Sequence, residues 1–182
     1  MAKKIPTKVT VLLADEEFER LDNYCRDRGF KLISGNAIAG GRFAIRDSGP
    51  QQLPCQQPPW GQLTAVDVNT GEFAWRVPLG VTDSLPPGKQ NTGRPGNGGT
   101  IATAGGLVFV GATDDARFRA FDAKTGKELW TVKLGGAAQA TPSTYLGKDG
   151  RQYVVTASTG GGFFDSPLTD DSIIAYALPA SR

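Results

Sequence analysis

The stretch FRAFDAKTGKELW at residues 118–130 decides the fold, because a close copy, AVDVNTGEFAW, occupies residues 65–75. Aligning residues 65–80 with residues 120–135, 55 positions further on, leaves eight of the sixteen positions identical. A third, truncated copy begins at IIAYALP, where Ala175 again follows Ala120 by 55 positions. An enzyme motif rarely repeats within one chain, whereas a structural unit that stacks on its own copy does.

The repeat itself indicates paired strands. In both full copies an Asp and a Thr bracket a tight turn, a Gly closes it, and the next strand carries a Trp. From about residue 40 onward, short β-rich runs alternate with the turn sequences NTG, AGG, KTG and GKDG. No segment of helical periodicity separates these runs, so a parallel βαβ architecture is not expected. Repeats of this length, with four strands each, are typical of β-propeller blades.

Residues 1–39 differ in character and are predicted to form a short strand–helix appendage. Residues 1–31 hold 13 of the 38 charged side chains, and a β-branched KVTVLL precedes the helix-periodic DEEFERLDNYCRDRG. The segment resembles the opening of ribbon-helix-helix DNA-binding proteins, but the glycine-rich KLISGNAIAGGRF stands where their second helix would follow. DNA binding through residues 7–29 is therefore kept as an alternative, beside a surface appendage without a function of its own.

Composition excludes several classes of function. The net charge of +2 provides no electrostatic argument for nucleic acid or an anionic membrane as the main partner. The absence of histidine excludes a Ser-His-Asp triad, a Cys-His pair and a His-ligated metal site built from this chain alone. Cys25 and Cys55 match no zinc-site spacing. The sequence contains no run of 18 apolar residues, so no transmembrane helix is predicted. The N-terminal residues are not expected to form a secretory signal peptide.

The pattern A-x-D-x-x-T-G-x-x-x-W resembles the tryptophan-docking repeat of pyrroloquinoline quinone (PQQ) dehydrogenases. PCQQPPWGQLTAVDVNTGEFAWRVPLG, GGTIATAGGLVFVGATDDARFRAFDAKTGKELW and QATPSTYLGKDGRQYVVTASTGGG resemble the C-terminal blades of the quinoprotein glucose and alcohol dehydrogenases, over about residues 42–179. The resemblance implies an all-β fold for residues 40–182, a partial β-propeller of about two to two and a half four-stranded blades. The family closes a ring of eight blades, so the chain is expected to be a C-terminal fragment.

Two loops match positions that line the cofactor pocket in this family. In RPGNGGT an Asn precedes paired glycines just before a strand, and ASTGGG matches a glycine-rich loop that faces the quinone. Phe163 stands near the position where alcohol-oxidising members often carry a tryptophan. The simpler alternative is that glycines at strand ends only form turns. The residues predicted to contact PQQ are Asn97, Gly98, Gly99, Gly160, Gly161 and Gly162.

Other candidate residues are assigned structural roles. Asp114–Asp115 and Asp170–Asp171 are expected in hairpin loops, where solvated Asp is common. Trp75 and Trp130 are expected to dock neighbouring blades, and Trp60 to lie in the core. The segments in which the family carries its Ca²⁺ ligands and catalytic aspartate have no counterpart in this chain, so no catalytic or metal-binding residue is predicted.

The leading hypothesis is a fragment of a PQQ-dependent dehydrogenase of sugars or alcohols, periplasmic by resemblance and inactive by itself. PQQ would carry out the oxidation while the protein positions it. The alternative of a different class is a non-enzymatic propeller scaffold built from the same repeats. An incomplete propeller leaves unpaired strand edges, so self-association is also predicted.

Overall fold

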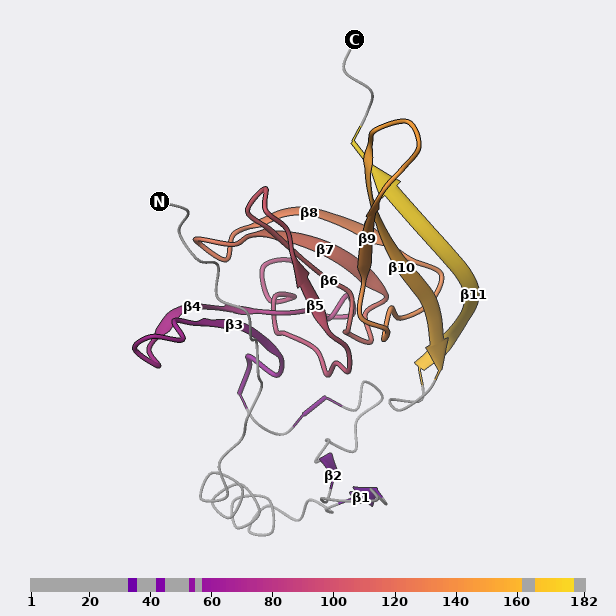
Figure 1. The fold of residues 1–182 in the computed structure, drawn as a ribbon. Coiled ribbons are helices and arrows are strands. Elements are labelled where there is room, and N and C mark those ends of the chain that lie inside the picture. Colours follow the sequence, from indigo (N-terminus) through magenta and orange to yellow (C-terminus); the bar gives the residue numbers. More distant parts are fainter. Residues whose placement is uncertain (1–32, 36–41, 45–52, 55–56, 162–165, 179–182) are drawn as a thin grey trace.

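The computed structural model describes residues 33–35, 42–44, 53–54, 57–161 and 166–178 (Figure 1). These residues form eleven strands, and they contain no helix. The all-β prediction is therefore confirmed for the described part of the chain. The predicted KVTVLL strand and the helix after it lie outside the described residues, and the boundary between residues 39 and 40 stays a prediction.

One complete four-stranded blade lies in the middle of the molecule. Its strands β5 (Thr100–Ala102), β6 (Leu107–Val110), β7 (Arg117–Asp122) and β8 (Glu128–Lys133) are antiparallel neighbours in chain order. Short hairpins join consecutive strands, as expected of a meander whose turns are rich in glycine. This sheet is the predicted full blade.

Two incomplete units flank that blade (Figure 1). On one side β3 (Gln62–Val66) and β4 (Phe73–Pro78) form a two-stranded sheet. On the other side, three strands pair in the order β11-β10-β9, namely β9 (Ser143–Leu146), β10 (Gln152–Gly161) and β11 (Ser166–Ala177). Units of two, four and three strands confirm the predicted partial propeller. A separate antiparallel pair joins β1 (Ile33–Gly35) to β2 (Arg42–Ala44).

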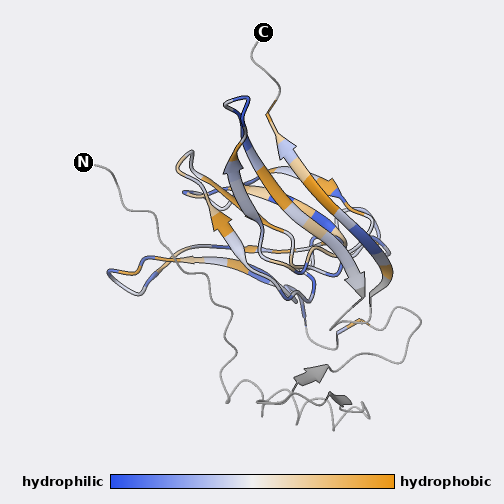
Figure 2. Ribbon diagram, turned by 45° about the vertical axis from the view of Figure 1, so that its right-hand side comes forward, coloured by the Kyte–Doolittle hydropathy of each residue, from blue (hydrophilic) through white to orange (hydrophobic). Residues whose placement is uncertain are grey.

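The core consists of two apolar clusters, one on each face of the middle blade. Leu63, Val108, Val110 and Phe121 belong to the cluster shared with β3–β4, and Trp75 packs against it. Phe118, Leu134, Ala138 and Val154 form the cluster shared with the three-stranded unit. Successive residues of β7 point alternately to the two faces of the blade, and Phe118 and Phe121 lie on different faces. Both are buried, because each face is covered by another sheet. Figure 2 shows hydrophobic stretches along the strands and hydrophilic residues at hairpin tips.

The repeated turns have the same geometry in both copies. The carboxylate of Asp122 accepts hydrogen bonds from the backbone N–H groups of Lys124 and Thr125, and Asp67 accepts one from Asn69. Gly71 and Gly126 adopt positive φ angles of 76° and 71°, which glycine tolerates without steric cost. These turns lie at one end of the sheets. The antiparallel order therefore places the connections 79–99, 111–116 and 134–142 at the opposite end.

Candidate cofactor-binding site

A cavity of about 440 Å³ lies at the end of the sheets opposite the repeated turns. Residues at and just before the start of β3, in the 79–99 connection, at the start of β5 and around the end of β6 contribute to its walls, among them Trp60, Gln62, Arg94, Asn97, Thr100 and Ala112. Gly98 and Gly99 also line it. The structure thus brings the whole of the first predicted loop to one concave site, whose size falls in the range of about 300–1,000 Å³ that small-molecule sites occupy.

Asn97 is held in this wall by its backbone. Its N–H donates to the carbonyl oxygen of Ala112 at 2.9 Å, and the neighbouring Gly96 forms an isolated bridge with Thr113. Ala112 has a φ of 58°, a left-handed conformation that non-glycine residues rarely adopt. The Asn97 residue remains exposed. Its amide is therefore free to interact with a ligand while its backbone is fixed by the 111–116 loop.

Close packing within the protein accounts for Gly98 and Gly99. A Cβ atom on Gly98 would lie 2.9 Å from the carbonyl oxygen of Gln139 and 3.1 Å from Cα of Ala112. A Cβ atom on Gly99 would lie 2.8 Å from Cγ2 of Thr141. Real Cβ atoms essentially never lie within 3.0 Å of another heavy atom, so the packing of Gln139 and Thr141, in the connection after β8, favours glycine at both positions whatever the cavity binds.

The second predicted loop lies at the end of β10. Gly160 has a φ of 67° and donates its N–H to the carbonyl oxygen of Ala137 at 3.0 Å. A side chain at Gly160 would overlap the carbonyl group of Leu168 in β11. Gly161 pairs with Ser166. Gly162 and Phe163 lie outside the described residues.

The connection that follows β8 runs between the two loops. At its start Gly136 packs against Gly160, and the carbonyl oxygen of Ala137 accepts from Thr159 and Gly160. Further along, the carbonyl oxygen of Ala138 accepts from Ala112 at 2.7 Å, next to Gly98. Both glycine-rich loops therefore pack on one connecting segment, although Gly160 and Gly161 do not line the cavity that contains Asn97.

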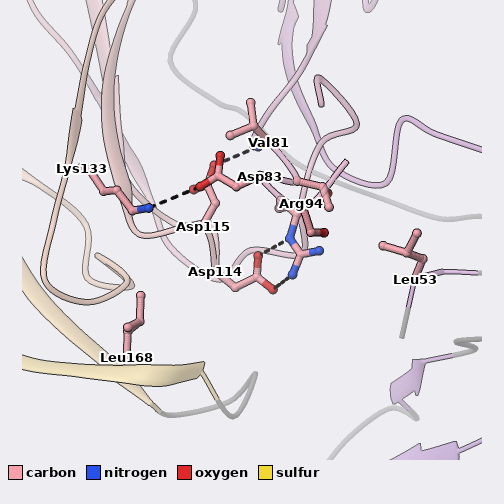
Figure 3. A pocket seen from close by; sticks show the side chains of 10 residues that line it. Leu53, Val81, Asp83, Arg94, Asp114, Asp115, Lys133 and Leu168 are labelled. Carbon is pink, nitrogen blue, oxygen red and sulfur yellow. Dashed lines mark hydrogen bonds and ion pairs between the residues drawn. The ribbon is translucent and has the colours of Figure 1, made fainter. Parts of the chain in front are cut away.

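A second cavity, of about 270 Å³, adjoins the first and is mainly polar (Figure 3). Asp83, Asp114, Asp115 and Lys133 lie in its walls, and Arg94 lines both cavities. Arg94 did not emerge from the sequence as a functional residue. The sequence feature that could have identified it is its position two residues before Gly96, in the same RPGNGGT loop as Asn97.

Asp114 and Asp115 lie in the hairpin connection between β6 and β7, as predicted, but the expectation that they are solvated is wrong. Asp115 is 3% exposed, forms an ion pair with the equally buried Arg119, and accepts hydrogen bonds from the Thr113 hydroxyl at 2.6 Å and the Val81 N–H at 2.8 Å. Asp114 accepts a bidentate pair from Arg94. Their partners come from the 79–99 connection and from β7, which cover the loop. The pattern DDARFR, with two arginines close behind two aspartates, was the available signal.

The pKa of Asp115 reflects this environment. Burial by itself would raise it, but the hydrogen bond and positive charge of Arg119 outweigh that cost, with help from Thr113 and Val81. The net result is a pKa below the ordinary value of 3.8. Asp115 is therefore ionised at neutral pH and acts as a structural anion, because its oxygens are occupied by protein donors.

Asp170 and Asp171 also differ from the prediction, because they lie within β11 and not in a hairpin loop. Asp170 accepts a hydrogen bond from the Ser172 hydroxyl at 2.8 Å. Hydrogen bonds from the side chains of Ser158 and Ser172 lower the pKa of Asp170. Asp170 and Asp171 lie at an irregularity of this strand, because the pairing of β10 with β11 shifts register between Ser158–Ser172 and Gly160–Thr169.

The predicted structural tryptophans have distinct surroundings. Trp75 donates its indole N–H to the carbonyl oxygen of Ala123 at 3.0 Å, across the junction between β3–β4 and the middle blade. Trp130 makes an edge contact with Tyr176 at a centroid distance of 5.1 Å, across the other junction. Both therefore dock neighbouring units. Trp60 was expected in the core and lies in the wall of the larger cavity.

Comparison with known proteins identifies the family. Residues 7–154 match the PQQ family model, described as the beta-propeller domain of glucose/ethanol/alcohol dehydrogenases. The chain belongs to this family. Among the residues that the structure describes, no helix is long and apolar enough to cross a membrane, and no three acidic or cysteine side chains are grouped to hold a metal ion.

Relatives share the sequence over most of this chain. The quinate/shikimate dehydrogenase (quinone) of Acinetobacter baylyi is 47% identical over 133 residues, which cover 69% of this chain and 16% of the relative. Quinoprotein glucose dehydrogenase A of Acinetobacter calcoaceticus is 45% identical over 138 residues, 73% of this chain and 17% of its own length. The chain thus spans about a sixth of the curated relatives that it matches.

Solved structures show the same fold. The quinohemoprotein alcohol dehydrogenase of Comamonas testosteroni superposes with a TM-score of 0.51 at 32% identity, over 69% of this chain and 17% of that protein. A europium-containing methanol dehydrogenase superposes with a TM-score of 0.51 at 29% identity, over 75% of this chain and 21% of that protein. These matches confirm that the blades are those of a quinoprotein propeller.

Proposed function

We propose that the chain supplies one part of the PQQ-binding pocket of a dehydrogenase that oxidises a sugar or an alcohol. The observation that carries the proposal is the 440 Å³ cavity, in which the exposed Asn97 stands beside Trp60 and Arg94. PQQ is a planar quinone that carries carboxylates. An aromatic side chain, amide groups and a guanidinium suit such a molecule, because they provide a stacking surface and hydrogen-bond donors.

The residues of this chain would bind and orient the cofactor. The Asn97 amide would donate to a cofactor oxygen, while Gly98 and Gly99 keep the adjacent wall free of side chains. Gly160, Gly161 and Gly162 are proposed as a second contact to the cofactor, outside the 440 Å³ cavity, and the connection after β8 links Gly160 to the first loop. When bound, PQQ supplies the two-electron acceptor for the oxidation of the substrate.

The remaining parts of the enzyme are proposed to lie in segments that this chain does not contain. Such segments would supply the Ca²⁺ ligands and the catalytic aspartate, and the whole enzyme would work in the periplasm. We therefore expect the chain alone to bind PQQ without turning over a sugar or an alcohol.

A titration of the purified chain with PQQ in the presence of Ca²⁺ tests this proposal. Binding should quench the combined fluorescence of the three tryptophans in a saturable manner, through Trp60 in the cavity wall. Asn97→Ala should weaken the affinity for PQQ about tenfold, which corresponds to the loss of one or two buried hydrogen bonds. Asn91→Ala is the matched control, because Asn91 is exposed in the same connection and lines neither cavity. Equal affinity for PQQ in the wild type and Asn97→Ala, or no saturable binding, would contradict the proposal.

Self-association is part of the same proposal. Tyr145, Tyr153 and Ile173 share the face of the three-stranded unit that points away from the middle blade, and Ile173 is 80% exposed. Among the described strands β11 pairs on one side only. Light scattering coupled to size exclusion should therefore report species larger than the monomer, and Ile173→Glu should shift them toward the monomer. A stable wild-type monomer at micromolar concentration would contradict this part.

A further inference from the structure

We propose that Arg94 binds the carboxylate of a ligand at the boundary between the two cavities. The inference rests on the proposed function for the identity of the ligand, which is either the cofactor or a hydroxy-acid substrate. The sequence did not indicate Arg94 as a functional residue. In the structure its guanidinium group is pre-oriented, has an unused hydrogen-bond donor and lies in a network of charges that sum to zero.

The backbone of Arg94 is tightly held. Its N–H donates to the carbonyl oxygen of Leu79 at 2.7 Å. A Cβ atom on Gly80 would lie 2.6 Å from Cβ of Arg94, and one on Gly61 would lie 3.0 Å from the Arg94 backbone nitrogen. Because two segments cross Arg94 at glycines, its backbone cannot shift without displacing both of them. The direction in which the side chain leaves the backbone is therefore set in advance.

The guanidinium group is also oriented before any ligand binds. Nε donates to Oδ1 of Asp114 at 2.7 Å, and Nη2 donates to Oδ2 at 2.6 Å. Among the described residues, none accepts a hydrogen bond from Nη1, and Figure 3 shows this third nitrogen directed away from Asp114. The side chain is 22% exposed. A planar, pre-oriented guanidinium with a free edge loses little entropy when it binds an anion.

The neighbouring carboxylates do not repel an anion strongly, because each of them already has a basic partner. Asp83 pairs with Arg117 and Lys133, and Asp115 pairs with Arg119. Glu128 is the other carboxylate of the network and lies 3.4 Å from Arg119. Four carboxylates, counting Asp114, thus face four cations, and the network is neutral. A ligand anion at Nη1 of Arg94 meets no uncompensated negative charge.

A guanidinium edge binds a carboxylate through short, charge-assisted hydrogen bonds. Two sources of this group fit the proposed function. PQQ carries carboxylates, and two relatives bear names that specify quinate or shikimate, which are hydroxy acids. Other relatives are named for glucose or glycerol, which have no carboxylate. Arg94 would accordingly either anchor the cofactor or favour acidic polyols over neutral ones.

Isothermal titration of the full chain separates these sources. In one arm PQQ is added with Ca²⁺, and in the other arm quinate is added, with glucose as the neutral probe. Arg94→Met should weaken binding of PQQ or quinate about tenfold. The affinity of Arg94→Lys for the same ligand should lie between that of Arg94→Met and that of the wild type. Lys124→Met, in the turn at the opposite end of the middle blade, is the matched control for the loss of one positive charge.

Removing Arg94 leaves the largely buried Asp114 without its partner, so the double variant Arg94→Met/Asp114→Asn is included as a second test. The double variant should bind PQQ or quinate, whichever ligand Arg94→Met binds more weakly than the wild type, as weakly as Arg94→Met does. A loss of affinity confined to PQQ indicates that Arg94 binds a carboxylate of the cofactor. A loss of affinity confined to quinate indicates that Arg94 binds the carboxylate of a substrate. A wild type that binds neither carboxylate, or unchanged affinities for both in Arg94→Met, would overturn the proposal.

The two proposals fail differently. PQQ binding that depends on Asn97 but not on Arg94, with quinate binding equally insensitive to Arg94, would refute only the role of Arg94. Quinate binding that depends on Arg94 without any binding of PQQ would refute only the proposed cofactor pocket.

Discussion

The two blade junctions use the same residue of the same repeat and are built differently. At the first junction Trp75 places its ring over Gly126, where a Cβ would lie 2.5 Å from Cε3, and donates its indole N–H to Ala123 at 3.0 Å. At the second junction Trp130 packs edge-on against Phe118 and Tyr176, is 38% exposed, and finds no described acceptor for its indole N–H.

The difference arises in the partner and not in the tryptophan. Trp75 docks on a complete repeat, whose turn provides a glycine and a free carbonyl. The third copy has Ala177 and Ser181 at the positions of Asp122 and Gly126, so the turn that would receive Trp130 is missing from its sequence. A docking motif is therefore a property of two successive repeats, since one supplies the indole and the next supplies its receptor.

The largest effect is expected when each indole is removed in turn. Trp75→Ala should lower the free energy of unfolding by about 3–5 kcal/mol, as for other large-to-small core substitutions. Trp130→Ala should cost about half as much, because its ring is more exposed and makes no described hydrogen bond. Urea denaturation followed by circular dichroism measures both, and equal losses would show that the two junctions are energetically equivalent.

The matching glycines isolate the receptor of the first junction. Gly71 and Gly126 occupy the same repeat position with positive φ, but only Gly126 lies under an indole, whereas no atom lies within 4 Å of a Cβ on Gly71. Gly71→Ala should cost about 1–2 kcal/mol of left-handed strain. Gly126→Ala should cost about 1–3 kcal/mol more, because the added methyl displaces Trp75.

Thermal or urea unfolding of the two glycine variants provides the comparison. The double variant Gly126→Ala/Trp75→Ala is the control, since without the indole the extra cost at Gly126 should disappear. A similar loss at Gly71 and Gly126 would contradict the proposed stacking.

Acid should weaken the first junction through Asp115, which ties the connection after β4 to the middle blade. The folded pKa of Asp115 lies below its ordinary value of 3.8, so its ionisation stabilises the fold above that value. This stabilisation should begin to decline as the pH falls below about 4 and be lost as the pH passes through the folded pKa. The difference in unfolding free energy between wild type and Asp115→Asn should shrink over that window. A constant difference from pH 6 to pH 2.5 would exclude this linkage.

The smallest effect concerns the turns that both repeats share. The hydroxyl oxygens of Thr70 and Thr125 accept from backbone N–H groups two residues further on, at 3.2 Å and 3.3 Å. Thr125 also donates to Asp122 at 2.9 Å. Thr70→Ala and Thr125→Ala should each cost about 0.5–1.5 kcal/mol, with the greater loss at Thr125. Thr→Ser at each position should restore most of the stability, and a larger loss at Thr70 would contradict the ranking.

Sequence reasoning succeeded where the relevant contacts are local or repeated. The Asp, Thr and Gly of each turn bond within a few residues, so their roles could be inferred from spacing alone. It failed for the burial of Asp114 and Asp115, because Arg94 and Val81, which come from the connection that covers them, are 20 and 34 residues away in the chain. For Gly98 and Gly99 it recognised the need for glycine but not its cause, which is the packing of Gln139 and Thr141 against them.

By itself, the sequence determined the all-β class, the length of the repeat and the family, because strand alternation, turn chemistry and a docking tryptophan depend on residues a few positions apart. Only the tertiary structure decided which tryptophan meets a complete receptor, which aspartates are buried and which arginine borders both cavities. These properties depend on connections that cross between sheets, and elementary patterns do not encode which distant charge or carbonyl such a connection will bring into contact.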